Sequence, residues 1–150
     1  MDHLFIIALV LSGLTAFALQ TELYWLLGSW PGWIKGDTYN WVQKVYGALG
    51  DMNSHYPFLA YGYDWLAFAH LVIAVAFIGP LRDPVRNKWI IEFGMIACIM
   101  VFPLAFVAGA VRGIPFYWRL IDCSFGIVGL APLGICYNKI RWLEKWDVIK

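Results

Sequence analysis

Four long apolar stretches dominate the chain and are separated by segments in which polar and charged residues gather. The stretches cover residues 4–27, 58–79, 89–111 and 120–137. Each is close to the roughly 20 residues that a helix needs to cross the hydrocarbon core of a bilayer. The pattern therefore predicts an all-α integral membrane protein, a four-helix transmembrane bundle that forms a single domain over residues 1–150.

The first connecting segment, 28–57, carries a second kind of helical pattern. From Thr38 to about Leu49, apolar residues recur at helical spacing, and Asp37 is placed to cap the start of this helix. The apolar face comprises Trp41, Val42, Val45, Tyr46 and Leu49, and the polar face Asn40, Gln43 and Lys44. We expect a short amphipathic helix that lies in the outer membrane interface or over the mouth of the bundle, followed by a turn over 51–54.

Within each span, small residues recur along one side and lead to a charged residue near the same membrane face. The four stripes are Ala8, Leu11, Thr15, Ala18 and Glu22; Ala60, Asp64, Ala67, Leu71, Ala74 and Ile78; Gly94, Cys98, Val101, Ala105, Ala108 and Arg112; and Asp122, Gly126, Gly129, Leu133 and Cys136. Membrane helices pack through small residues. The stripes therefore predict that the charges point into the bundle.

Composition supports the membrane assignment. The chain is 61% hydrophobic and only 14% charged, against about 25% charged residues in soluble domains. Nine Trp, eight Tyr and ten Phe suit aromatic belts at the membrane interfaces. A net charge of +1 indicates no nucleic-acid partner, and three cysteines without a C-x-x-C motif indicate buried thiols rather than a disulfide framework.

Lysine and arginine in the short loops predict the orientation. Seven lie on one side, namely Arg82, Arg86, Lys88, Lys139, Arg141, Lys145 and Lys150, and four on the other, namely Lys35, Lys44, Arg112 and Arg119. We therefore expect a cell-membrane protein with both termini in the cytoplasm.

The segment 4–27 is interpreted as a retained span, because Met1-Asp2-His3 lacks the positive charge of a signal peptide.

The predicted outer charges form a polar cluster with two interpretations. Its members are Glu22, Asp64, Arg112, Arg119 and Asp122. Ion pairing would close the bundle, because unpaired charges in apolar surroundings are strongly penalised. Alternatively, the cluster lines a pocket that opens to the outside. Three acids against two arginines leave one acid over, which could bind a cation or be protonated.

His70 is the deepest ionisable residue of the predicted bundle, about 18 Å into the second span at 1.5 Å per residue. It is interpreted either as a hydrogen-bonded structural residue or as an acid–base or substrate contact. Haem or a metal ion would need a second ligand beside it, and His3 and His55 lie outside the spans. No metal or other cofactor is therefore expected.

Two further features lie at the inner face and within the spans. The inner-face charges are interpreted either as a charge lock between helix ends or as a basic loop with one neutralising Asp; they are Arg82, Asp83, Arg86 and Glu92. Glu92 is expected to pair with Lys88, Arg82 or Arg86. Pro103 and Pro132 each remove a backbone donor and are expected to kink their helices. Such breaks can line cavities in membrane proteins.

No catalytic motif is present, so we expect a non-enzymatic binding bundle or a subunit of a membrane assembly. The alternative is a transporter or enzyme for a lipid or small molecule, with an outward-facing polar pocket. That pocket would use Asp64, His70, Arg112, Arg119 and Asp122. The expected partners are the lipid bilayer, other membrane subunits or a second copy of the chain, and a lipid or small-molecule ligand.

Overall fold

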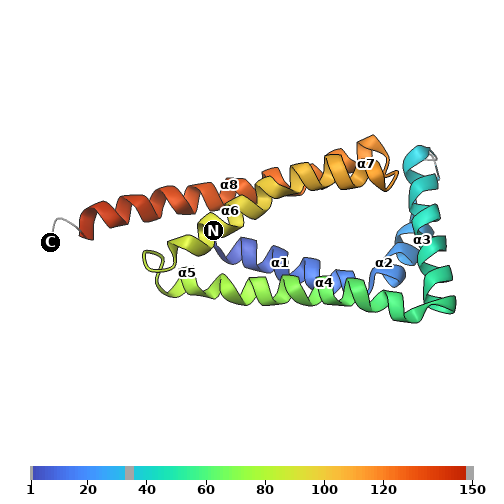
Figure 1. The fold of residues 1–150 in the computed structure, drawn as a ribbon, viewed down its shortest axis with the longest axis horizontal. Coiled ribbons are helices and arrows are strands. Elements are labelled where there is room, and N and C mark those ends of the chain that lie inside the picture. The colour runs from blue at the N-terminus through green and yellow to red at the C-terminus, as the bar shows by residue number, and fades with distance from the viewer. Residues whose placement is uncertain (1, 33–35, 148–150) are drawn as a thin grey trace. The chain divides into compact units, whose positions relative to one another are not determined.

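The computed structural model describes residues 2–32 and 36–147, and every regular element in them is a helix (Figure 1). These are α1 (Asp2–Phe17), α2 (Leu19–Gly28), α3 (Asp37–His55), α4 (Pro57–Ala76), α5 (Ile78–Arg82), α6 (Lys88–Pro103), the π-helix η1 (Leu104–Ala108), α7 (Gly109–Val111) and α8 (Phe116–Asp147). The all-α prediction is confirmed for these residues. Lys35 and Lys150, used above for the orientation, lie outside them.

Three helical segments are long and apolar enough to cross a membrane, namely Pro57–Arg82, Lys88–Val111 and Phe116–Lys145. The first predicted span is not one straight helix, because α1 and α2 meet at an angle of 87°. Ala18 leaves the helical conformation there, with φ −98° and ψ 14°. The segment predicted as a span over 4–27 is therefore bent within its length, and it counts as a fourth span only if the bent pair is taken as one.

The chain divides into two compact units, which are described separately. Unit 1 comprises the described residues of 1–8 and 74–150, and unit 2 those of 9–73. In unit 1, α6 and α8 run side by side (Figure 1). In unit 2, α2 packs against α3, and α1 packs against α4 through Gly13.

Glycines bring α6 and α8 together in unit 1. A Cβ atom on Gly126 would lie 2.6 Å from the carbonyl oxygen of Cys98, and one on Gly129 would lie 2.8 Å from the Cys98 Sγ. Small residues permit this backbone approach. The stripes predicted for the third and fourth spans are thus confirmed as the faces that pack, with Cys98, Ala105, Leu133 and Cys136 buried.

An aromatic residue closes the core of unit 1 beside this helix pair. Phe77 is completely buried, and its ring would meet a Cβ atom on Gly94 at 2.6 Å. The ring of Phe5, from the first turns of α1, lies 4.7 Å from that of Phe77. The start of α1 therefore belongs to the core of unit 1.

In unit 2, the packed face of α1 surrounds Gly13 and differs from the predicted stripe. A Cβ atom on Gly13 would lie 2.9 Å from the carbonyl oxygen of Ala67, which is itself completely buried. The predicted positions are all exposed, namely Ala8, Leu11, Thr15, Ala18 and Glu22. The prediction for this span is wrong because one glycine permits closer helix contact than a row of alanine, leucine and threonine.

Helix α3 is longer than predicted and ends at His55 instead of turning at 51–54. Its apolar face is the more covered one, with Val42 only 2% exposed, whereas Gln43 and Lys44 are exposed. Asn53 explains the extra turn, because its amide donates to the Gln20 side chain of α2 and accepts a 3.2 Å hydrogen bond from the Tyr63 hydroxyl of α4. Three helices of unit 2 are tied together at this residue.

Candidate functional site

Unit 1 contains an open pocket where the chain passes from α6 through η1 and α7 to α8. It has a volume of about 300 Å³. The lining residues are Val101, Leu104, Ala105, Ala108, Gly109, Arg112, Ile114 and Asp122. Ala105 is buried at its base, whereas Leu104 is 66% exposed at its rim. We call this cavity the η1 pocket.

The pocket lies beside a change in helix geometry. Pro103 is the last residue of α6 and offers no backbone N–H, and the next five residues form the π-helix η1. The N–H of Gly109 donates to the carbonyl of Leu104, five residues earlier, as the wider π-turn requires. Single π-turns inside α-helices are frequent at functional sites. Three η1 residues, Leu104, Ala105 and Ala108, line the pocket.

A tight turn closes one end of the pocket. Gly113 has φ +66°, a left-handed conformation that glycine adopts without strain. Its N–H donates to the carbonyl of Ala110, and that of Ile114 donates to the carbonyl of Gly109. This pair of bonds is the Schellman arrangement that ends a helix, and it places Arg112 as the C-cap residue at the pocket rim.

Arg119 holds this turn from α8. Its Nε donates a 2.7 Å hydrogen bond to the carbonyl oxygen of Ile114. The aliphatic part of the same side chain packs on Gly109, where an added Cβ atom would lie 3.0 Å from the Arg119 Cδ. Arg119 therefore braces the turn that shapes the pocket, and its Nε is used by the backbone.

The two charged residues of the pocket have opposite signs. Arg112 is exposed at the C-cap of α7, and Asp122 is half-buried on α8. They are not within ion-pair distance of each other, because the ion pairs found among the described side chains join other residues. The remaining lining is aliphatic apart from Gly109. The pocket therefore combines an apolar wall with one cationic and one anionic group.

The other predicted site residues of the outer cluster lie in unit 2. Glu22 is exposed on α2, and Asp64 is half-buried on α4. His70, also half-buried on α4, has its Nδ1 2.8 Å from the carbonyl oxygen of Leu66. A carbonyl oxygen only accepts, so Nδ1 carries the proton in this contact. The structure thus gives His70 a hydrogen bond to its own helix.

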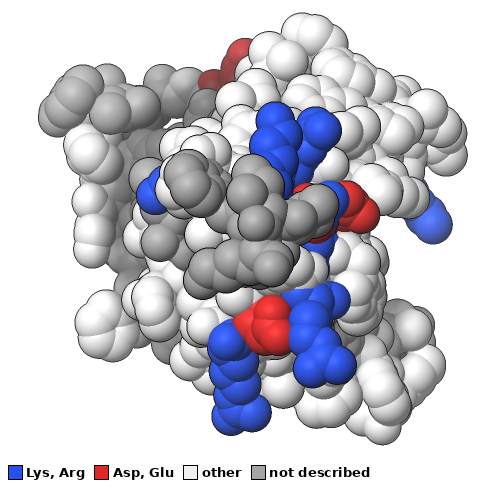
Figure 2. Space-filling view, turned by 90° about the vertical axis from the view of Figure 1, so that its left-hand side faces the viewer, with Lys and Arg blue, Asp and Glu red and all other residues white. Residues whose placement is uncertain are grey.

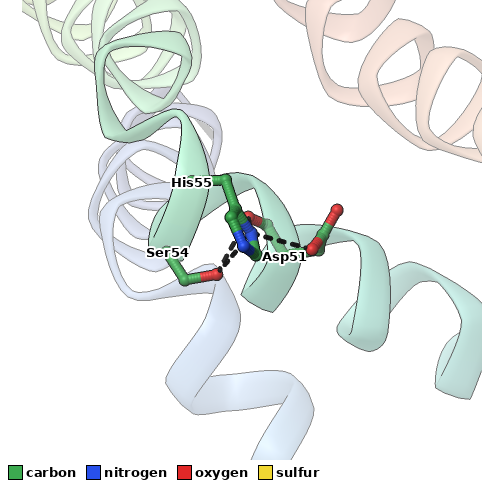
Figure 3. A network of polar contacts seen from close by, with 3 residues as sticks. All are labelled: Asp51, Ser54 and His55. Atoms are coloured by element: carbon green, nitrogen blue, oxygen red, sulfur yellow. Dashed lines mark hydrogen bonds and ion pairs between the residues drawn. The ribbon is translucent and has the colours of Figure 1, made fainter.

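A second polar network ends α3 (Figure 3). The Nδ1 of His55 lies 3.0 Å from the Asp51 carboxylate and 3.1 Å from both the Ser54 hydroxyl and the Asp51 carbonyl oxygen. In a nucleophile relay, serine and aspartate contact different ring nitrogens of the histidine. Here all three partners meet one nitrogen, so the network is a helix end and not a catalytic triad.

At its other end, the α6–α8 pair is joined by an ion pair and a ring contact. The Nζ of Lys88 lies 3.0 Å from the Glu144 carboxylate and 5.4 Å from the centre of the Tyr137 ring. A favourable cation–ring contact at that distance adds to the ion pair. Lys88 is thereby attached to α8 at two points.

The turn that precedes α6 is held by side-chain hydrogen bonds to the backbone. The Asp83 carboxylate accepts a 3.0 Å hydrogen bond from the backbone N–H of Arg86. The Asn87 amide donates to the carbonyls of Gly79 and Asp83. Of the predicted charge lock, Arg82 and Arg86 are exposed and Glu92 is half-buried.

Sequence reasoning missed several residues that shape these regions. Glu144 is 56 residues from Lys88, and only the antiparallel packing of α6 and α8 brings them together. Asn53 was assigned to a turn, although its place one helical turn beyond Leu49 could have suggested a longer α3. Within 2–32 and 36–147, no group of three or more His, Cys, Asp or Glu side chains is arranged to hold a metal ion.

Comparisons with known proteins found no match, whether with family models, with curated proteins or with solved structures. The η1 pocket is the feature of unit 1 best suited to hold a ligand, because it combines an open cavity, a break in helix geometry and two charged groups.

Proposed function

We propose that the chain is a multi-pass membrane protein that binds a small amphipathic molecule in the η1 pocket. Three segments have the length and hydropathy of membrane spans, and the bent pair α1–α2 supplies a fourth apolar segment. Large apolar side chains are exposed along these helices, for example Leu66, Val75, Ile96 and Val128. Such surface is unfavourable in water but suits hydrocarbon.

Charge supports an orientation in which the turn at 82–88 and both termini lie in the cytoplasm. Lysine and arginine gather on that turn and on the C-terminal segment, and cytoplasmic loops carry an excess of these residues. The segments 28–57 and 112–119 would then lie outside. In this orientation the η1 pocket belongs to the outer half of the α6–α8 pair.

The observation that carries the proposal is the composition of the pocket wall. Small-molecule sites are mostly apolar, with a few polar groups that fix the orientation of the ligand. The aliphatic wall would hold a short hydrocarbon chain or ring, and Arg112 and Asp122 would hold its polar end. The exposed rim at Leu104 gives a ligand a route from the membrane into the pocket.

The chemistry of the two charged groups favours binding over catalysis. An arginine side chain stays protonated in proteins and cannot act as a general base. Its planar guanidinium is well suited to hold a carboxylate or phosphate. The Asp122 carboxylate, not paired with Arg112, is available to an ammonium or hydroxyl group. The pocket therefore fits a polar head group held at two points.

Filling the pocket should abolish binding. The substitution Ala108→Phe places a ring in the pocket, whereas Ala110→Phe places the same ring on an exposed position of the neighbouring helix. Native mass spectrometry of protein released from membranes should show a small-molecule adduct on the wild type and on Ala110→Phe. The adduct should be absent from Ala108→Phe.

Thermal unfolding of the two variants serves as the control for folding. The proposal is supported if the two variants have equal melting temperatures and, of the two, only Ala110→Phe carries the adduct seen on the wild type. The same adduct on both variants, or no adduct on the wild type, would count against it.

A further inference from the structure

The basic end of unit 1 has the properties of a binding surface for anionic lipid. Figure 2 looks onto the end of the molecule where this surface lies and shows Lys and Arg side chains gathered there, with fewer acidic ones between them. Among the side chains that the structure describes, six cationic residues belong to this end, against Asp83, Glu92 and Glu144. The cations are Arg82, Arg86, Lys88, Lys139, Arg141 and Lys145. We call this surface the basic rim.

Most of the rim's positive charge is not neutralised by ion pairs. Glu144 is paired with Lys88. The Asp83 carboxylate accepts the backbone N–H of Arg86 and forms no ion pair with a neighbouring guanidinium among the described residues. The other five cations are all exposed. The rim therefore presents a net positive charge to its surroundings.

The depth of the rim matches a lipid head-group layer. Helix α8 has 32 residues and is about 48 Å long, so it exceeds a hydrocarbon core of about 30 Å by several turns. Trp89 and Trp142 are exposed at this end, and exposed tryptophans typically lie at the membrane–water interface. Lys139 and Arg141 precede Trp142 on the same helix. Long basic side chains at such positions reach toward the head groups.

The rim is also rigid on the side where lipid would dock. The Lys88–Glu144 ion pair and the Lys88–Tyr137 contact fix the start of α6 to α8. The Asn87 and Asp83 side chains fix the turn that carries Arg82 and Arg86. Preorganised groups lose less conformational entropy when a ligand binds. The turn and the end of α8 thus present cations from two segments on a fixed framework.

We propose that the basic rim binds anionic phospholipids of the inner leaflet through their phosphate groups. This inference rests on the proposed membrane location but not on the η1 pocket, which lies elsewhere in unit 1. Clusters of four to eight basic residues beside a transmembrane helix attract anionic lipid, with about a fivefold gain in binding for each cation. Two cations removed together should therefore reduce binding by about 25-fold.

The test uses the full chain in detergent, with phosphatidylglycerol and phosphatidylcholine as probes and native mass spectrometry as the readout. The wild type should retain phosphatidylglycerol over phosphatidylcholine. The pairs Arg82→Gln with Arg86→Gln, and Lys139→Gln with Arg141→Gln, should each weaken that preference. Lys44→Gln, on exposed α3 outside the rim, should keep it, and so should the exchange Lys139→Arg with Arg141→Lys.

Two results would overturn the inference. One is equal retention of the two lipids by the wild type, and the other is an undiminished preference in both neutralised pairs. Raising the salt concentration should weaken the preference, because screening reduces the attraction between exposed charges. The Ala108→Phe variant should keep its phosphatidylglycerol, which separates a failure of this inference from a failure of the pocket proposal.

Discussion

At the scale of single residues, glycine positions determine how the helices approach each other. Gly126 lies directly against the backbone of α6, and Gly13 lies directly against the backbone of α4. Other glycines of the same helices face open space, as Gly134 does on α8. The residue type does not tell a glycine at a helix contact from one that faces open space. That distinction requires knowing which face of the helix the glycine lies on.

The substitution Gly126→Ala should therefore destabilise unit 1, because its Cβ atom would lie 2.6 Å from the carbonyl oxygen of Cys98. Overpacking of this kind costs about 1–3 kcal/mol. Gly134→Ala should leave stability unchanged or raise it by up to about 1 kcal/mol, because alanine favours the helix more than glycine. Thermal unfolding in detergent, monitored by circular dichroism, distinguishes the two variants. Equal melting temperatures would show that the close approach at Gly126 is not required.

How well the site residues could be predicted depended on where their partners lie in the sequence. Arg112 and Asp122 could be singled out, because a charge near the end of an apolar span is conspicuous. Their neighbours Leu104 and Ile114 could not, since an aliphatic residue that lines a pocket resembles one that faces lipid. The bond from Arg119 to the Ile114 carbonyl depends on the turn at Gly113, which only the folded chain reveals.

At the scale of elements, the pattern predicted helices better than their ends. The third and fourth spans appeared with the predicted packing faces, because their small residues meet in one helix pair. The bend at Ala18 was not predictable, since Leu14–Leu19 contains no proline and no change in hydropathy. The extra turn of α3 depends on Asn53 meeting Gln20 and Tyr63, and the sequence does not show that those residues converge.

The bend gives a prediction about α2. Since α1 is 16 residues and α2 meets it at 87°, a membrane-crossing α1 would leave α2 in the plane of the interface. Tyr24 and Trp25 are exposed on α2, as suits that layer. Nitroxide labels placed singly at positions 19–28 should show a depth that oscillates with the helical period of about 3.6 residues. A depth that changes steadily along the segment would instead show a straight span.

At the scale of the whole molecule, the two ends of the α6–α8 pair differ in their chemistry. One end carries the η1 pocket, with an apolar wall and two opposite charges. The other carries the basic rim, with exposed cations. Charge counts in the sequence predicted which segments are basic, whereas the pocket depends on η1, and a π-helix has no simple sequence signal. We expect an amphipathic molecule to occupy this pocket.

Photolabelling of the full chain in lipid nanodiscs tests that claim most directly. The probe is a medium-chain fatty acid with a diazirine at the end of its chain, and mass spectrometry of peptides locates the label. We expect saturable labelling of pocket residues such as Ala105 and Ala108, and the labelling should be reduced by Ala108→Phe and by excess unlabelled fatty acid. Val107 and Val111, which are 66% and 80% exposed on the same segment, report unspecific contact with lipid. The proposed occupant would be contradicted if the label fell equally on those valines and on the pocket residues, and if excess fatty acid did not reduce it.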